Sequence, residues 1–290
     1  MDATSGIERA LERALSFATS GDRPPLLCKA VEHAVFAGGA RVRPRLCIAV
    51  AEACGNPYPE ASMSAATAIE MLHAASLVHD DLPCFDNSDL RRGKPSVHIA
   101  YGEPLALLAG DALIVMAFET LARDCAVTPH RLGPLIATIA RAVGMPNGIV
   151  AGQAWESEPK IDVEEYHRTK TASLFVGATA AGAIAADSDP QPWMEVGRQL
   201  GAAYQVADDL RDALATAKEM GKPCKQDAPN SQPNMVDELG VPATLARLQD
   251  FVTNAVEAVP NVPGSDGLRS LIHGEVKRLM PGKLIRSAAA

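Results

Sequence analysis

The sequence predicts an all-α fold, a single helical bundle. Alanine is abundant, long runs of β-branched residues are scarce, and apolar residues recur at helical spacing in most segments. Hydrophobic residues make up 47% of the 290 positions and charged residues 21%, which is typical of a folded, soluble globular protein. Because we find no repeat and no long linker, we expect one domain over residues 1–290.

Glycine and proline mark the ends of the predicted helices in the N-terminal half. The run at 21–25 separates the first two helices, the glycines at 38–39 close the second, and the run at 55–57 closes the third. Pro83 ends the long fourth helix, because proline removes a backbone donor and disfavours helix in the residue before it. The predicted helices of this half cover residues 5–17, 25–37, 43–54, 59–82 and 104–125.

Similar breaks at 145–148 and 187–190 divide the C-terminal half. The segment at 174–186 is apolar on nearly all sides and rich in alanine and glycine, so we expect a tightly packed internal helix there. The polar segment 221–237 is predicted to be a loop. The predicted helices of this half cover residues 130–144, 147–157, 162–186, 190–213, 242–257 and 266–279.

Charge and composition exclude several classes of function. The net charge of −8 argues against general nucleic-acid binding, which needs a basic face. The six cysteines form no CxxC pair, which argues against structural zinc and disulfides and fits a reducing, cytoplasmic setting. The N-terminus lacks a signal-peptide pattern, and no uncharged apolar stretch reaches the ~18 residues of a transmembrane segment.

Two acidic clusters, each at the end of a long apolar run, predict a cation site. Two carboxylates ~6 Å apart repel by roughly 3 kcal/mol at an effective dielectric of ~20, so a chain that repeats the arrangement is expected to bind cations there. Oxygen-rich ligand sets favour Mg²⁺, which binds through a few carboxylates and substrate phosphates. The candidate metal ligands are Asp80, Asp81, Asp86, Asp208, Asp209 and Asp212.

The spacing of these carboxylates supports the prediction. Asp208 and Asp212 are four residues apart and share one helix face, with Gln205 one turn before them. An unbroken helix would rotate Asp86 by ~240° from Asp80, so we expect the chain to turn after residue 82 and bring Asp86 back. The alternatives are a solvated charged helix end and an ordinary acidic turn.

Basic residues near these clusters predict an anion site. Arg91 and Arg92 follow the first cluster, and arginine makes forked hydrogen bonds to phosphate. Arg43 follows the glycines at 38–39, which allow close backbone approach to a ligand. Weaker signals are the pair at 170–171 and Lys222, since a lone lysine is most often a surface residue.

The face of the fourth helix below Asp80 predicts a pocket. His73 is aligned with Asp80 along the helix, and Ala75 and Ser76 are small where such a pocket would run down from the acidic rim. Phe118, on the next long helix, would supply its floor. The alternative for His73 is a core histidine with satisfied hydrogen bonds.

Together these residues resemble the trans-prenyl diphosphate synthases over nearly the whole chain. The glycine-arginine motif corresponds to residues 38–44, the first aspartate-rich motif with its arginine pair to 73–93, and the later motifs to 170–171 and 205–212. The segments at 80–87 and 151–158 are similar to those of geranylgeranyl diphosphate synthases of the carotenoid pathway in purple phototrophic bacteria. The family usually has lysines near Ala40 and Gln232, which are absent here.

The resemblance implies a homodimer of isoprenoid synthase bundles, each with a central cavity, and about three Mg²⁺ ions per site bound together with substrate diphosphate. It implies that Asp80, Asp86 and Asp208 are the chief metal ligands, with Asp81 and Asp212 assisting. The implied contacts to the allylic diphosphate are Arg91, Lys170, Thr171, Gln205 and Lys222. The implied contacts to isopentenyl diphosphate are Arg43, His73 and Arg92. The implied catalytic residues are Asp80, Asp81, Asp86, Arg91, Lys170 and Asp208.

The implied reaction is magnesium-assisted ionisation of an allylic diphosphate, attack by isopentenyl diphosphate and loss of a proton. Because Ala75 and Ser76 leave the shaft open, we expect a twenty-carbon product, geranylgeranyl diphosphate, rather than the fifteen-carbon farnesyl product. The rival functions are a non-catalytic partner subunit, a terpene cyclase and a purely structural bundle.

Overall fold

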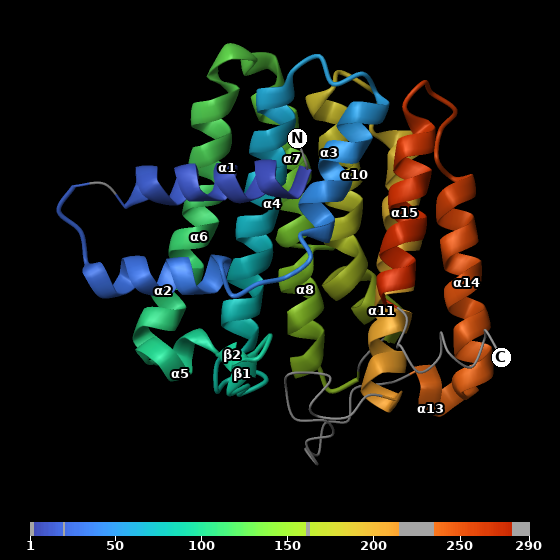
Figure 1. The fold of residues 1–290 in the computed structure, drawn as a ribbon. Coiled ribbons are helices and arrows are strands. Elements are labelled where there is room, and N and C mark those ends of the chain that lie inside the picture. The colour runs from blue at the N-terminus through green and yellow to red at the C-terminus, as the bar shows by residue number, and fades with distance from the viewer. Residues whose placement is uncertain (1–2, 20, 161–162, 215–234, 280–290) are drawn as a thin grey trace.

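The computed structural model describes residues 3–19, 21–160, 163–214 and 235–279, and it confirms the predicted all-α bundle (Figure 1). Lys222 and Gln232 lie outside the described residues. The long helices are α1 (Ala3–Ala18), α2 (Pro25–Val35), α3 (Val42–Ala53), α4 (Pro59–Asp80), α6 (Glu103–Asp124), α7 (Pro129–Val143), α10 (Ser173–Ala185), α11 (Gln191–Leu214), α14 (Val241–Glu257) and α15 (Ser265–Leu279). The short elements are α5 (Val97–Tyr101), η1 (Cys125–Val127), α8 (Ile149–Ala154), η2 (Trp155–Ser157), α9 (Val163–His167), η3 (Arg168–Ala172) and α13 (Met235–Leu239).

Helix α10 lies in the middle of the bundle and joins two parts of the core. Its Leu174 and Ala178 pack in a cluster with α4, α6 and α7, and its Phe175 packs in a second cluster with α3, α11 and α14. The predicted internal helix at 174–186 is therefore confirmed. As Figure 1 shows, α1 and α2 lie across the outside of α4 and α6.

Small residues let α10 approach its neighbours closely. A Cβ added at Gly182 would lie 2.3 Å from the carbonyl oxygen of Cys47 on α3, and one at Gly177 would lie 2.5 Å from the Cβ of Ala142 on α7. Backbones this close leave no room for side chains, and the many alanines of the sequence serve the same dense packing.

Helix α6 is long and apolar enough, by length and composition, to cross a membrane. In the bundle it packs along α4, and its Ala106, Ala109, Leu113 and Ala117 are buried in the core. Composition alone does not distinguish a membrane-crossing helix from a core helix, whereas the packing of α6 against α4 identifies it as part of the core.

The structure departs from the predicted elements in several places, among them α5, which no predicted helix covers. A short hairpin, β1 (Leu90–Arg91) and β2 (Lys94–Pro95), lies where no strand was expected, because strands of two residues carry no periodic pattern. The predicted helix 162–186 contains one π-helical turn, η3, between α9 and α10. Residues 235–237 of the predicted loop begin α13 instead. Residues 221–234 of that loop lie outside the described residues.

Candidate active site

The two acidic clusters lie at the same end of the bundle. Helices α4 and α11 both run toward the end that carries the hairpin and α13 (Figure 1), so Asp80 ends α4 and Asp208 lies in the last two turns of α11. Two segments that are more than a hundred residues apart in the sequence thus contribute carboxylates to one end of the fold.

The chain turns sharply at the end of α4, as the sequence predicted. The backbone N–H of Asp86 donates to the carbonyl of Asp80 at 2.9 Å, and that of Asn87 donates to Leu82 at 3.1 Å. Asn87 has a φ of +46°, a conformation that asparagine tolerates better than most residues. These contacts fold residues 81–87 back over the helix end and bring Asp86 near Asp80.

Asp81 is neutralised within the chain by Arg91. The Nε of Arg91 lies 3.0 Å from Oδ1 and 3.2 Å from Oδ2 of Asp81, and its Nη2 also bonds Oδ1. The same guanidinium reaches to 3.7 Å from Asp80 Oδ2. Because Asp81 is buried, this forked pair fixes Arg91 beside the two carboxylates of α4.

The hairpin aims Arg92 at the glycine segment. Arg92 and Gly93 form its two-residue loop with φ values of +54° and +77°, the pattern of a type I′ turn. The Arg92 guanidinium donates to the carbonyl of Gly38. A Cβ at Gly39 would lie 2.2 Å from Nη1 of Arg92, and Gly39 has a φ of +126°. The left-handed backbone of Gly38 and Gly39 favours glycine in this segment.

Further contacts fasten this hairpin to α2. Lys94 Nζ donates to the carbonyl of Phe36 at 3.1 Å, and His33 Nε2 lies 2.8 Å from the carbonyl oxygen of Pro95. The hairpin thereby joins the glycine segment to the first acidic cluster.

The three arginines at 41–45 have different partners. Arg41 is buried and binds Glu70 at 2.6 Å and Glu8 at 2.8 Å, and Arg45 binds Glu275. Arg43 instead lies over the ring of Phe175, 4.5 Å from its centroid, and its Nη1 is 3.3 Å from His73 Nε2. The Nε of Arg43 is buried without a hydrogen-bond partner, which marks it as a donor available to a ligand.

His73 lies in a strongly cationic setting. Burial, together with the charges of Arg43, Arg92, Arg91 and Arg41, holds its pKa well below the usual value of 6.5. The ring is therefore neutral near pH 7. The structure brings together Arg43, His73 and Arg92, the three residues that the family resemblance assigns to one substrate.

The π-helical turn η3 presents Lys170 and Thr171 to the two acidic helices. Lys170 Nζ is 3.5 Å from Asp80 Oδ1 on α4, and the hydroxyl of Thr171 donates to Gln205 Oε1 on α11 at 2.7 Å. A Cβ at Gly152 of α8 would lie 2.3 Å from the backbone nitrogen of Lys170, so glycine permits this approach. Single π-helical turns are frequent at functional sites because they redirect side chains.

The carboxylates on α11 face different surroundings. Asp208 and Asp212 are exposed, and Asp208 is 3.1 Å from Arg211 Nη1. Asp209 is buried, where it accepts hydrogen bonds from Gln205 at 3.0 Å and from the backbone of Met235 at 2.9 Å. The metal-ligand prediction for Asp209 stays a prediction, and the described contacts give this residue a role in holding α13 against α11.

Glu156 is a residue at this site to which the sequence gave no role. It accepts hydrogen bonds from Tyr166, Gln153 and Lys170. Its position in the segment 151–158 was noted only as part of the resemblance. Contacts of this kind depend on how η2 packs against η3, and no local pattern reports that packing.

The donors present fit a hard divalent cation. Asp80 Oδ1 is buried and has no hydrogen-bond partner. The carboxylates of Asp81 and Asp86 lie close to it in the chain, and carboxylate oxygens are the ligands that Mg²⁺ prefers. Within the described ranges, no three His, Cys, Asp or Glu side chains are already grouped to hold a metal ion. The residues therefore fit an ion whose remaining ligands come with a bound anion.

The residues predicted to set the shaft lie along α4 and α6. Ala75 is buried, and Ser76 is half-buried with its hydroxyl donating to the carbonyl of His73 at 2.9 Å. Phe118 is half-buried and packs against the core cluster of α4 and α6. Their proposed effect on a ligand stays a prediction.

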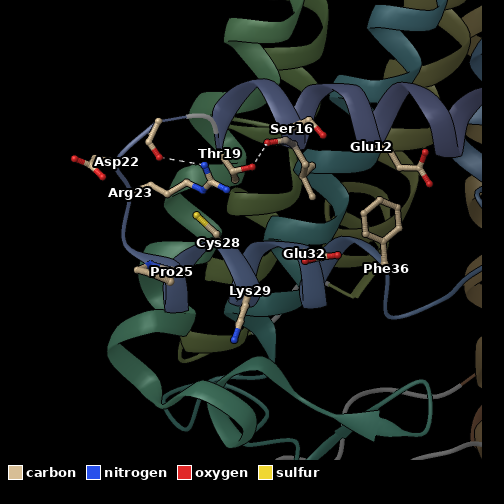
Figure 2. A pocket seen from close by; sticks show the side chains of 12 residues that line it. Glu12, Ser16, Thr19, Asp22, Arg23, Pro25, Cys28, Lys29, Glu32 and Phe36 are labelled. Atoms are coloured by element: carbon tan, nitrogen blue, oxygen red, sulfur yellow. Dashed lines mark hydrogen bonds between the residues drawn. The ribbon is translucent and has the colours of Figure 1, made fainter.

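A separate cleft of about 590 Å³ lies between α1 and α2 (Figure 2). Side chains of both charges line it, among them Glu12, Arg23 and Lys29. None of the predicted site residues lines this cleft, and the chemistry points instead to the acidic end of the bundle.

Comparisons with known proteins identify the relatives of this chain. The sequence pattern of the family described as "Polyprenyl synthetase" matches residues 24–238. The chain is 48% identical to the geranylgeranyl diphosphate synthase of Cereibacter sphaeroides over 96% of each chain. It is also 48% identical to that of Rhodobacter capsulatus, over 94% of this chain and 95% of the relative.

Solved structures show the same fold. An FPP/GFPP synthase from Zymomonas mobilis superposes with a TM-score of 0.80 at 31% identity, covering 94% of this chain and 98% of that one. A geranyltransferase from Helicobacter pylori, complexed with magnesium and isoprenyl diphosphate, gives a TM-score of 0.77 at 29% identity, covering 96% and 98%.

The lowered pKa of His73 predicts a pH-dependent stability. As the pH is lowered from 7.5 to 5.5, the unfolded chain takes up a proton at His73 that the folded chain does not. The free energy of unfolding therefore decreases as the pH is lowered. Replacing His73→Gln should remove up to about 1.4 kcal/mol per pH unit of this fall below pH 6.5. Urea unfolding at several pH values measures it, with exposed His273→Gln as the control. Equal slopes for wild type and His73→Gln would contradict the prediction.

Proposed function

Because the chain belongs to the polyprenyl synthetase family, we propose that it condenses an allylic diphosphate with isopentenyl diphosphate to form geranylgeranyl diphosphate. One observation above all supports the proposal. Lys170 and Thr171, consecutive on η3, reach Asp80 on α4 and Gln205 on α11, so one cationic turn connects both acidic helix ends. Such an arrangement suits a diphosphate held between them.

The allylic diphosphate is proposed to lie between α4 and α11, near Lys170, Thr171, Gln205 and Arg91. Asp80, Asp86 and Asp208 would hold about three Mg²⁺ ions, assisted by Asp81 and Asp212, and the bound ions would withdraw charge from the diphosphate. The buried Asp80 Oδ1 that has no hydrogen-bond partner supports the metal assignment. The Lys222 contact stays a prediction, since this residue is not among those described.

Isopentenyl diphosphate is proposed to bind at Arg43, His73 and Arg92. Arg43 and Arg92 supply charge, and the buried Nε of Arg43 supplies a donor without a present partner. A neutral His73 can donate one hydrogen bond without adding a further charge to the four arginines around it.

The proposed reaction begins when the allylic C–O bond breaks and both of its electrons leave with the diphosphate. Arg91 and Lys170 stabilise the charge that develops on the leaving oxygens. The double bond of isopentenyl diphosphate then attacks the allylic cation and forms the new C–C bond. A proton is lost from the adjacent carbon to the released diphosphate, and the apolar side chains below the acidic rim keep water from the cation.

A twenty-carbon product is supported by the names of the two bacterial relatives and by the small residues on α4. Ala75 and Ser76 leave room below Asp80, and Phe118 is proposed as the floor. We propose a cytoplasmic enzyme of isoprenoid synthesis that supplies carotenoids, and one domain over residues 1–290. The packing of α15 against α3 and of α14 against α11 supports that single domain.

A homodimer is proposed, and the outer face of α5 and α6 supports it. Ile99, Leu107, Leu108 and Val115 are all exposed there, and Val115 keeps 68% of its surface. Apolar side chains gathered on one face favour association. Sedimentation equilibrium should give twice the chain mass of 30.5 kDa, and Leu108→Asp with Val115→Asp should give monomers. A wild-type monomer at micromolar concentration would contradict the dimer.

The purified protein alone tests the proposed reaction. Incubated with farnesyl diphosphate, isopentenyl diphosphate and Mg²⁺, it should form geranylgeranyl diphosphate, and EDTA should stop the reaction. Asp80→Asn or Asp208→Asn should lower kcat at least about 100-fold, because transition-state charge loses its stabilisation. Exposed Asp250→Asn is the control. If no prenyl product forms without a second protein, the chain is a non-catalytic subunit. A hydrocarbon formed without isopentenyl diphosphate would indicate a cyclase.

The shaft assignment predicts a change in product length. Ser76→Phe should shift the product from twenty toward fifteen carbons, since the ring would fill space one turn below Asp80. Chromatography of dephosphorylated products measures the ratio, and Ser76→Ala should leave it unchanged. The same profile for Ser76→Phe and wild type would mean that the growing chain passes elsewhere.

A further inference from the structure

The ammonium group of Lys170 lies between two carboxylates and contacts them unequally. Its Nζ is 2.5 Å from Oε1 of Glu156 and 3.5 Å from Oδ1 of Asp80. The first contact is a charge-assisted hydrogen bond, and the second separation is too long for a good one. Lys170 is therefore held on the Glu156 side of the gap.

As a result, Asp80 keeps one oxygen available. Its Oδ1 atom is buried and has no hydrogen-bond partner, although an ammonium lies only 3.5 Å away. A buried carboxylate oxygen without a donor is costly unless a cation or a donor binds it. A shift of Lys170 by about 1 Å toward Asp80 would satisfy this oxygen, and Glu156 opposes that shift.

Glu156 is itself held firmly in place. The hydroxyl of Tyr166 donates to its Oε1 at 2.7 Å, and the side-chain amide of Gln153 donates to its Oε2 at 2.7 Å. Tyr166 is buried, and its ring centroid lies 5.6 Å from Lys170 Nζ. Donors on both oxygens fix the carboxylate, so its position does not depend on Lys170 alone.

We propose that Glu156 is a positioning residue that keeps Lys170 off Asp80, so that Asp80 Oδ1 stays available to Mg²⁺ arriving with a diphosphate. The inference rests on the proposed function. An ammonium bonded to Asp80 would compete with a divalent cation for the same oxygen. Glu156 prevents this competition and still leaves Lys170 beside the place where the diphosphate would bind.

Metal binding without turnover tests the proposal. The full-length protein is titrated with Mg²⁺ at saturating inorganic pyrophosphate, and the rise in melting temperature reports binding. Glu156→Gln should raise the half-saturating Mg²⁺ concentration about tenfold, the effect of weakening one hydrogen bond to a charged group. Glu158→Gln removes an exposed carboxylate two residues away and should leave this concentration unchanged.

Two further variants separate positioning from a loss of structure. Adding Lys170→Met to Glu156→Gln removes the competing ammonium, so the half-saturating Mg²⁺ concentration should fall back toward the wild-type value. Glu156→Asp keeps the charge with a shorter reach and should give a smaller rise than Glu156→Gln. An unchanged Mg²⁺ requirement in Glu156→Gln, or the same rise in the single and double variants, would overturn the proposal.

The two proposals fail in different ways. If wild type forms the prenyl product and the Glu156 variants keep the wild-type Mg²⁺ requirement, the positioning role is wrong and the enzyme assignment stands. If wild type shows no Mg²⁺-dependent rise in melting temperature with pyrophosphate and forms no product, the site itself is wrong, and both proposals fall with it.

Discussion

Repulsion between clustered carboxylates is the constraint on which the acidic end of this bundle depends. Asp80 and Asp81 end one apolar helix, and Asp208 and Asp209 lie in the last two turns of another at the same end of the fold. Such charges stay close only where cations or donors offset them. Arg91 forms hydrogen bonds with Asp81, and Arg211 forms an ion pair with Asp208. Asp209 accepts hydrogen bonds from the side-chain amide of Gln205 and from the backbone of Met235.

Some of these charged groups have partners within the chain for all their polar atoms, and others do not. Asp209 is engaged in holding α13, whereas Asp80 has a buried oxygen with no hydrogen-bond partner. On the cationic side, Arg41 and Arg45 are engaged with carboxylates, whereas Arg43 has a buried nitrogen with no hydrogen-bond partner. The groups with spare capacity are an acceptor at the carboxylate cluster and a donor at the arginine cluster. That combination suits a metal-bound anion beside a second anion.

Backbone geometry delivers these groups to their places. The two-residue loop of the hairpin sets Arg92 against the glycine segment, and the π-helical turn directs Lys170 and Thr171 to different helices. A Cβ at Gly152 would clash with the backbone of Lys170, and Gly39 has a positive φ that favours glycine. The apolar helices fix where the acidic helix ends lie, and these short irregular segments orient the side chains around them.

Local sequence patterns predicted the long helices, the internal position of residues 174–186 and the turn after α4, and they named the candidate site residues, whose roles stay predictions. Helical periodicity, proline and charge spacing are local signals that survive in a one-dimensional pattern. Three features became clear only from the folded arrangement: which of the three arginines at 41–45 has no carboxylate partner, the presence of the hairpin, and the hydrogen bond from Lys170 to Glu156. Those outcomes depend on contacts between segments far apart in the chain, and side-chain partners across such contacts leave no periodic trace in the sequence.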